Sequence, residues 1–294
     1  MKIALLPNLT REPAKETTLE ICKWLKEYGA EYACTDDDFP EFSGTLLKRH
    51  MEFSKLISWC DAVITVGGDG SMLMAAKKTV DFLKPILCIN AGRLAFMAGL
   101  ERDELHLLKA LIDGTYYHDK RMLIEASLIR DGKTISKYHC INDVVLSRPQ
   151  QMKIADINVE CDGRHVNTYR ADGIIIATPT GSSAYSLSAG GPILNPSIEA
   201  IVVSPICPQS LFARSIVFSS DNKVDIYCAP ESRNSDLILS CDGEFCETIH
   251  KGDIISISKS DKYVDFIRIK EENFLEILNN KLAGRNEVKS CERP

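Results

Sequence analysis

Residues 62–79 read AVITVGGDGSMLMAAKKT, and this stretch decides the fold. Ala62–Val66 is an unbroken apolar or β-branched run, which is typical of a strand buried on both faces of a parallel sheet. Ser71–Thr79 favours a helix, and Gly67–Gly70 joins the two elements. Glycines between a parallel strand and a helix let the backbone approach a ligand and direct free N–H groups at phosphate oxygens. The stretch therefore predicts an α/β sheet with an anion-binding loop.

Asp69 is the single charged residue among these glycines. A carboxylate repels phosphate, so its presence indicates a base for an attacking hydroxyl, a partner for Mg²⁺, or both. The structural alternative is that Asp69 caps the N-terminus of the following helix. The chain contains neither G-x-x-x-x-G-K-[ST] nor G-x-G-x-x-G, which excludes a P-loop and the usual dehydrogenase fingerprint.

Alternating strands and helices extend on both sides of this loop. Further strands are predicted at Ile3–Leu6, Glu31–Thr35 and Pro85–Ile89. Further helices are predicted at Pro13–Tyr28, Leu46–Cys60 and Asp103–Ile112. Residues 1–115 are therefore expected to form a Rossmann-like parallel α/β domain.

The character of the chain changes near residue 116, where helical periodicity ends and short strands follow. Hairpin turns are predicted at Asp131-Gly132, Asp162-Gly163 and Asp242-Gly243. We expect residues 116–268 to form a β-sandwich domain. Glu271–Leu282 has the spacing of an amphipathic helix, and residues 269–294 are expected to return to the first domain.

Composition excludes several classes of protein. The 294 residues carry a net charge of −6 with acidic and basic residues mixed, which argues against a nucleic-acid binder. The 11 cysteines include no C-x-x-C pair, which favours reduced thiols in the cytoplasm over a disulfide framework, and no dedicated metal cluster is expected. Gly173–Ile198 carries no charge, but it is too rich in Pro, Gly, Ser and Thr to span a membrane.

Two further stretches carry polar groups suited to a nucleoside. Asn142-Asp143 places a carboxamide beside a carboxylate, which can bracket the vicinal diol of a ribose, although an Asx turn explains the pair equally well. Ala171–Pro192 is an apolar run that leads into a loop crowded with hydroxyls and glycines. Buried hydroxyls need partners, and a ligand with many hydroxyl and ring-nitrogen groups would supply them.

The order and spacing of these stretches resemble those of the NAD kinase family. Gly67–Gly70, Asn142-Asp143 and Asp172–Pro192 match in sequence order, and Thr178–Pro192 resembles the most distinctive motif of that family. Asp242–Glu244 resembles a later motif. The Gly-Gly-Asp-Gly element alone is shared with lipid kinases and phosphofructokinases, so the Thr178–Pro192 block is what separates NAD kinases from those relatives.

The resemblance implies both an activity and a set of site residues. It implies phosphorylation of the adenosine ribose 2′-hydroxyl of NAD to give NADP, with ATP as donor and a divalent cation such as Mg²⁺. Asp69 is the implied general base. The implied nucleotide-binding positions are Gly68, Gly70, Asn142, Asp143, Arg170, Asp172, Ser183, Ala184, Tyr185, Ser188 and Asp242. The family also implies an α/β domain joined to a β-sandwich, and a homodimer or homotetramer.

Three departures from the family pattern accompany this resemblance. Asp143 stands where the family usually has Glu, Ala95 replaces a Gly, and Gln209 replaces a His. None of them touches Asp69, so we expect changes of affinity or donor preference only. Two alternatives stay open at this point, a lipid kinase of the same superfamily and a non-catalytic dinucleotide sensor.

Overall fold

The computed structural model describes residues 1–10, 12–92, 95, 97–149, 154–230, 232, 236–271, 274 and 278–279. The chain divides into two compact units, Met1–Asp119 with Asp265–Pro294 (unit 1) and Lys120–Val264 (unit 2). The expected boundaries of independently folding domains, 115/116 and 268/269, stay a prediction. The helix expected over Glu271–Leu282 lies largely outside the described residues.

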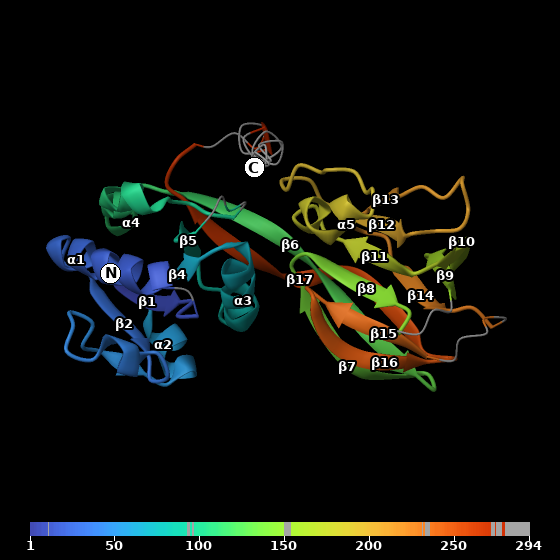
Figure 1. The fold of residues 1–294 in the computed structure, drawn as a ribbon, viewed down its shortest axis with the longest axis horizontal. Helices are drawn as coiled ribbons and strands as arrows, with labels where there is room; N and C mark the ends of the chain where they lie inside the picture. Colours follow the sequence, from blue (N-terminus) through green and yellow to red (C-terminus); the bar gives the residue numbers. More distant parts are fainter. Residues whose placement is uncertain are drawn as a thin grey trace, which may run out of the picture. The chain divides into compact units, whose positions relative to one another are not determined.

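Unit 1 is the predicted parallel α/β fold (Figure 1). Its strands are β1 (Lys2–Pro7), β2 (Glu31–Thr35), β3 (His50–Met51), β4 (Ala62–Gly67), β5 (Ile86–Asn90) and the end of β17 (Ile254–Arg268). They pair in the order β3-β2-β1-β4-β5-β17, and every pair is parallel. The helices are α1 (Glu12–Glu27), α2 (Phe53–Trp59), α3 (Asp69–Thr79) and α4 (Leu108–Asp113), with 3-10 turns η1 (Phe39–Phe42), η2 (Val80–Phe82) and η3 (Arg102–Leu107).

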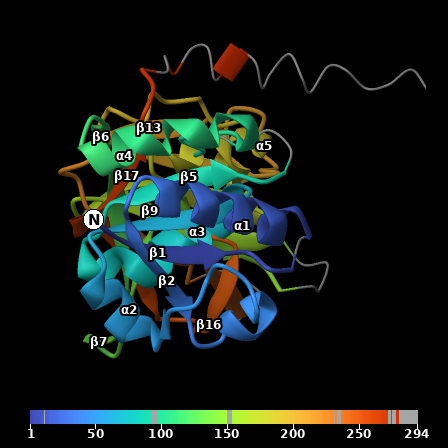
Figure 2. The ribbon, with the colours of Figure 1, turned by 90° about the vertical axis from the view of Figure 1, so that its left-hand side faces the viewer.

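The strand order of unit 1 reverses between β1 and β4. All six residues of β4 are buried between β1 and β5, as its apolar composition predicts. Helix α1 covers one face with Ile21, Cys22 and Leu25, and it contacts α4 on the same side (Figure 2). In open α/β sheets, ligands bind outside the carboxyl ends of the strands where the order reverses. This edge is where β4 ends in the glycine loop.

One predicted helix of unit 1 is only half right. Residues 46–60 were expected to be helical throughout, but α2 begins at Phe53. Glu52 caps it, and its carboxylate accepts hydrogen bonds from the backbone N–H groups of Ser54 and Lys55. His50–Met51 instead forms strand β3 and pairs with β2, because ladder bonds at the sheet edge outweigh the weak helical periodicity upstream.

Unit 2 is an antiparallel β-sandwich. One sheet has the order β13-β12-β11-β8-β15-β16; the other contains β10-β9-β14-β17 together with the β6–β7 hairpin. The strands are β6 (Tyr117–Arg130), β7 (Lys133–Cys140), β8 (Asp143–Ser147), β9 (Ala155–Cys161), β10 (Arg164–Ala171), β11 (Gly173–Ala177), β12 (Ala200–Ile206), β13 (Ile216–Ser219), β14 (Val224–Cys228), β15 (Asp236–Cys241) and β16 (Glu244–His250). Alternating apolar residues of both sheets form one buried core.

The three predicted Asp-Gly turns are confirmed. Asp131, Asp162 and Asp242 have φ near +50°, each is followed by a glycine with positive φ, and the flanking strands pair as hairpins. This is the backbone that two-residue hairpin turns require.

The uncharged stretch Gly173–Ile198 forms β11, the 3-10 turn η4 (Gly181–Ser183) and the short helix α5 (Tyr185–Ser188), followed by a loop. No helix in the described part of the chain is long and apolar enough to cross a membrane.

Candidate active site

The glycine loop of unit 1 follows β4 directly and lies beside the end of β1. The Asn8 side chain donates a hydrogen bond to Ser71 Oγ over 2.7 Å, and the Asn8 backbone N–H donates to the Val66 carbonyl over 2.9 Å. A Cβ at Gly67 would lie 2.5 Å from Ser71 Oγ, so this close packing requires glycine. Asn8 thus bonds to residues on both ends of the glycine loop, Val66 before it and Ser71 after it, at the carboxyl edge of the sheet.

Asp69 is partly buried in the first turn of α3. The N-cap of this helix is Gly68, with no side-chain capping bond, so the N-cap alternative for Asp69 is wrong. Within the described residues, the hydrogen bond recorded for the Asp69 carboxylate comes from the backbone N–H of Met97, 2.9 Å from Oδ1. One oxygen is therefore anchored by a fixed donor, and this geometry suits a base whose other oxygen takes a proton.

In unit 2, Asp242 holds the loop that carries Asn142. Asp242 Oδ1 accepts hydrogen bonds from the N–H groups of Asn142 and Asp143 at 2.7 and 3.1 Å, and Oδ2 accepts from that of Ile141 at 3.0 Å. In return, the Asp242 N–H donates to the Asp143 carbonyl over 2.9 Å. These contacts give Asp242 a holding role inside the protein, and its contact with nucleotide stays a prediction.

Asp143 is buried, with 4 % of its surface exposed. Burial, and secondarily the negative charge of Asp242, raises the pKa of Asp143 from 3.8 to about 7. A carboxyl group with this pKa changes its protonation state near neutral pH, so Asp143 can act as a hydrogen-bond acceptor or donor, and its contact with a ribose stays a prediction.

The Thr178–Pro192 block is attached to the Asn142 loop by its backbone. The Thr178 N–H donates to the Asn142 carbonyl over 2.9 Å, and the Thr178 hydroxyl donates to the Ile141 carbonyl. A Cβ at Gly181 would lie 2.0 Å from the Asn142 carbonyl oxygen, which explains why glycine stands there. Asn142, Asp143, Asp242 and the start of the Thr-Pro-Thr-Gly turn therefore form one cluster.

The serines of this block divide into two groups. Ser182 and Ser186 are buried: the Ser182 hydroxyl donates to the Pro179 carbonyl, and Ser186 Oγ lies 3.1 Å from Ser204 Oγ. The predicted binding residues, by contrast, are all partly or fully accessible: Ser183, Ala184, Tyr185 and Ser188. Tyr185 is 47 % exposed, so its ring can stack on a ligand.

Arg170 and Asp172 lie apart from this cluster. They precede β11, whereas the Asn142 loop pairs with the last residue of β11, Ala177. The length of that strand, roughly 13 Å, separates the two ends. Asp172 accepts a hydrogen bond from Arg148 Nε over 2.7 Å, and Arg170 forms a loose ion pair with Asp156 at 3.9 Å.

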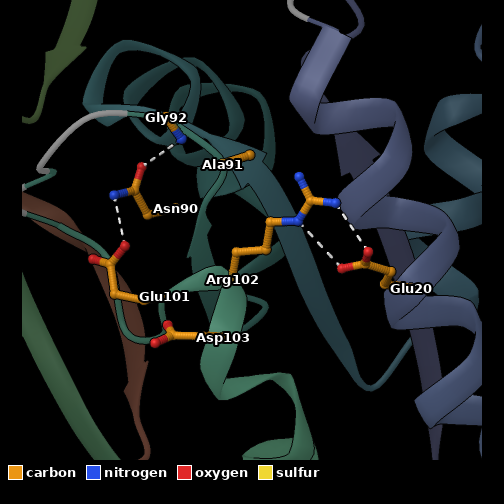
Figure 3. Close-up of a pocket in the computed structure, with 7 residues that line it drawn as sticks. All are labelled: Glu20, Asn90, Ala91, Gly92, Glu101, Arg102 and Asp103. Atoms are coloured by element: carbon orange, nitrogen blue, oxygen red, sulfur yellow. Dashed lines mark hydrogen bonds and ion pairs between the residues drawn. The ribbon is translucent and has the colours of Figure 1, made fainter.

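A pocket of about 570 Å³ lies in unit 1, where β5 ends at Asn90 (Figure 3). Its lining residues are Glu20, Asn90, Ala91, Gly92, Glu101, Arg102 and Asp103. The buried Asn90 side chain donates to Glu101 over 2.8 Å and accepts from the Gly92 N–H over 3.0 Å. Burial raises the pKa of Glu101.

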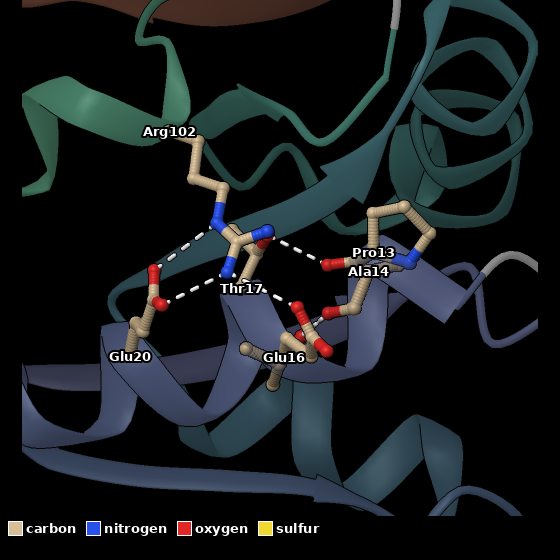
Figure 4. A network of polar contacts seen from close by, with 7 residues as sticks. Pro13, Ala14, Glu16, Thr17, Glu20 and Arg102 are labelled. Carbon is tan, nitrogen blue, oxygen red and sulfur yellow. Dashed lines mark hydrogen bonds and ion pairs between the residues drawn. The ribbon is translucent and has the colours of Figure 1, made fainter.

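Arg102 is the one cation among the described residues that line this pocket, and it is already paired with carboxylates. Arg102 donates to Glu20 at 2.9 Å and to Glu16 at 3.2 Å, both on α1 (Figure 4). The other charged groups among the described lining residues are carboxylates, which repel phosphate, and we assign the contacts of Arg102 a structural role in fastening η3 to α1.

Sequence reasoning missed Asn8, Ser71 and Met97. A polar residue directly after the first parallel strand is a usable signal for Asn8, because the carboxyl ends of parallel strands share one edge. Met97 contributes its backbone N–H, which no side-chain pattern reveals.

Two domains of a known protein family match this chain. Residues 3–116 match the ATP-NAD kinase N-terminal domain, and residues 141–269 match the ATP-NAD kinase C-terminal domain. A protein named NAD kinase from Thermoanaerobacter sp. (strain X514) is 36 % identical over 97 % of this chain and 99 % of its own length. The chain belongs to the NAD kinase family. A second NAD kinase of this family, from Prosthecochloris aestuarii, is 35 % identical over 99 % of both chains.

Two solved structures share the fold. The chain superposes on a crystal structure of yeast NADH kinase complexed with NADH with a TM-score of 0.87 at 24 % identity, covering 100 % of this chain and 90 % of the other. An NAD kinase from Archaeoglobus fulgidus in complex with ATP gives a TM-score of 0.75 at 23 % identity, covering 96 % and 99 %.

Proposed function

We propose that this NAD kinase family member transfers the terminal phosphoryl group of ATP to the 2′-hydroxyl of the adenosine ribose of NAD, giving NADP. The bond from the ribose oxygen to the γ-phosphorus forms, and the bond from that phosphorus to the β–γ bridging oxygen breaks, so ADP leaves. Asp69 accepts the hydroxyl proton. The observation that carries the proposal is a carboxylate in the glycine loop at the end of β4, anchored by one backbone N–H.

The surrounding groups support roles in binding rather than in proton transfer. The N–H groups of Gly68, Asp69 and Gly70 precede the first hydrogen bonds of α3, which Ser71 and Met72 donate to the Gly68 carbonyl, and such N–H groups at a helix start suit phosphate oxygens. Asn142 and Asp143 suit the ribose hydroxyls, and Tyr185 suits stacking against a nucleoside. Phosphoryl transfer depends mainly on such positioning and charge neutralisation, because a ribose hydroxyl is a weak nucleophile.

A divalent cation fits the residues present. Among the described residues, no group of three or more His, Cys, Asp or Glu side chains is arranged to hold a metal ion. The Asp69 carboxylate is the type of oxygen ligand that Mg²⁺ takes, alongside donor phosphates. When bound, Mg²⁺ would neutralise charge on the donor phosphates; no dedicated protein cage is needed for this.

We also propose a cytoplasmic homodimer or homotetramer. Ten cysteines in the described part of the chain are in no disulfide bond, which supports a reducing compartment. Arg170 and Asp172 lie apart from the Asn142 cluster. This separation supports an assembly in which these two residues contact a dinucleotide that is bound by a second copy of the chain. Size-exclusion chromatography with light scattering tests the assembly, and a monomer would contradict it.

The deciding experiment is a product assay. Incubation with Mg²⁺, ATP and NAD should yield NADP, and chelation of the cation by EDTA should abolish it. Polyphosphate in place of ATP, and NADH in place of NAD, then define the donor and the redox form. Tight NAD binding without any NADP from any donor would overturn the proposal in favour of a sensor, and phosphorylation of a lipid alcohol in place of NAD would favour a lipid kinase.

A further inference from the structure

Arg268, the last residue of β17, is nearly buried in unit 1, with 13 % of its side chain exposed. Its Nε donates to Asp119 Oδ2 over 2.9 Å. Its Nη1 donates to two consecutive backbone carbonyls, those of Met97 at 3.3 Å and Ala98 at 2.6 Å. One guanidinium therefore ties a carboxylate to a loop segment.

That loop segment is the one that anchors Asp69. The N–H of Met97 donates to Asp69 Oδ1, while the carbonyl of the same residue accepts from Arg268. The segment is packed tightly, because a Cβ at Gly99 would lie 2.8 Å from the Ile267 carbonyl oxygen. A continuous set of hydrogen bonds thus runs from Asp119 through Arg268 and Met97 to Asp69.

We infer that Arg268 is a positioning residue for phosphoryl transfer: it sets the Met97–Ala98 segment, and through the Met97 N–H it orients the Asp69 carboxylate. The inference rests on the proposed role of Asp69. The planar guanidinium suits the task, because it presents several donors in a rigid fork, whereas a lysine offers a single flexible point charge. A displacement of about 1 Å at a reacting group can lower the rate by about 10²-fold.

The chain offers a matched control in unit 2. Arg130, like Arg268, pairs with an aspartate and donates to a backbone carbonyl; it makes two hydrogen bonds to the buried Asp253, with Nε 2.8 Å from Oδ1 and Nη2 2.6 Å from Oδ2. Its third bond is to the Thr248 carbonyl, in a strand that carries none of the proposed site residues. Arg130→Gln therefore reports what the loss of an arginine–aspartate pair does to stability alone.

The test compares Arg268→Gln, Arg268→Lys and Arg130→Gln in the full-length protein at saturating Mg²⁺, ATP and NAD. We expect Arg268→Gln to lower kcat by about 10- to 100-fold with the KM for NAD within about threefold. Arg268→Lys should fall between Arg268→Gln and the unchanged protein, and it decides the question if Arg268→Gln does not fold. Arg130→Gln should lower the Tm and leave kcat within about twofold.

A double-mutant cycle separates positioning from general damage. In an Asp69→Asn background, Arg268→Gln should lower kcat little further, because there is no base left to orient. Normal kcat in Arg268→Gln or Arg268→Lys, or the same fractional loss with and without Asp69, would overturn the inference alone. Normal turnover of Asp69→Asn would overturn the proposed function instead.

Discussion

Asp69 in unit 1 and Asp242 in unit 2 are carboxylates in glycine-containing turns, yet their surroundings differ. Within the described residues, the Asp69 carboxylate takes a hydrogen bond from one backbone N–H, that of Met97. The Asp242 carboxylate takes three, from consecutive residues of the Asn142 loop. A carboxylate whose lone pairs are committed to the backbone holds a loop in place, whereas one with an oxygen to spare can accept a proton. The number of backbone donors therefore distinguishes the aspartate that holds a loop from the aspartate that we propose as the base.

Replacing Asp69 is the strongest way to break this comparison. Asp69→Asn keeps the acceptor for the Met97 N–H but removes the base, so we expect kcat to fall by about 10²- to 10⁴-fold while NAD binding persists. Steady-state kinetics and calorimetric titration with NAD measure the two effects. Near-normal turnover would remove Asp69 from the mechanism.

The pH dependence of the free energy of unfolding tests the raised pKa of Asp143, which lies close to the negative charge of Asp242. The pKa of Asp143 is raised to about 7 in the folded chain from 3.8, so between these values the unfolded chain binds fewer protons and stability falls as pH rises. The contribution is fully present below pH 3.8, and it is lost by about pH 7, amounting to at most about 4 kcal/mol.

Urea unfolding without nucleotide, from pH 4 to 8, measures this contribution as the difference between the unchanged protein and Asp143→Asn. As pH rises, the free energy of unfolding of the unchanged protein should fall relative to that of Asp143→Asn. Asp242→Asn, which removes the neighbouring charge, should make the shift smaller. A difference that does not vary with pH would show that Asp143 is ionised throughout.

Truncating Asp242 tests the holding role. Asp242→Ala leaves three loop N–H groups without their partner, so we expect the free energy of unfolding to fall by about 2–3 kcal/mol and the KM for NAD to rise about tenfold. Asp131→Ala is the matched control, since Asp131 is exposed and occupies the same position in an Asp-Gly turn. If the two variants behave alike, turn geometry rather than the hydrogen bonds explains the loss.

The smallest expected effect concerns Tyr185, which lies on the accessible side of the Thr178–Pro192 block. Tyr185→Ala removes the packing that we propose against the substrate without disturbing the buried serines, so the KM for NAD should rise about three- to tenfold and kcat should stay within about twofold. Initial-rate kinetics at varied NAD check this. An unchanged KM would place Tyr185 outside the binding surface.

Local patterns predicted much of the fold because they depend on neighbours in sequence. The apolar run Ala62–Val66 is the buried centre of the sheet, and the Asp-Gly pairs make the predicted hairpins. The helix expected over residues 46–60 failed in its first half, since pairing of β3 with β2 at the sheet edge is a tertiary choice.

The sequence by itself determined the two-part architecture and the presence of a carboxylate in a glycine loop of the kind that binds phosphate. The reason is that strand composition, turn residues and glycine placement act over a few residues. Only the tertiary structure decided which aspartate holds a loop with both oxygens and which takes a single backbone hydrogen bond among the described residues. The Asp242 side chain reaches the Asn142 N–H across 100 residues, and Arg268 reaches the Met97 carbonyl across 171. Backbone amides carry no sequence label, so their pairing with these side chains emerges only when the chain is folded.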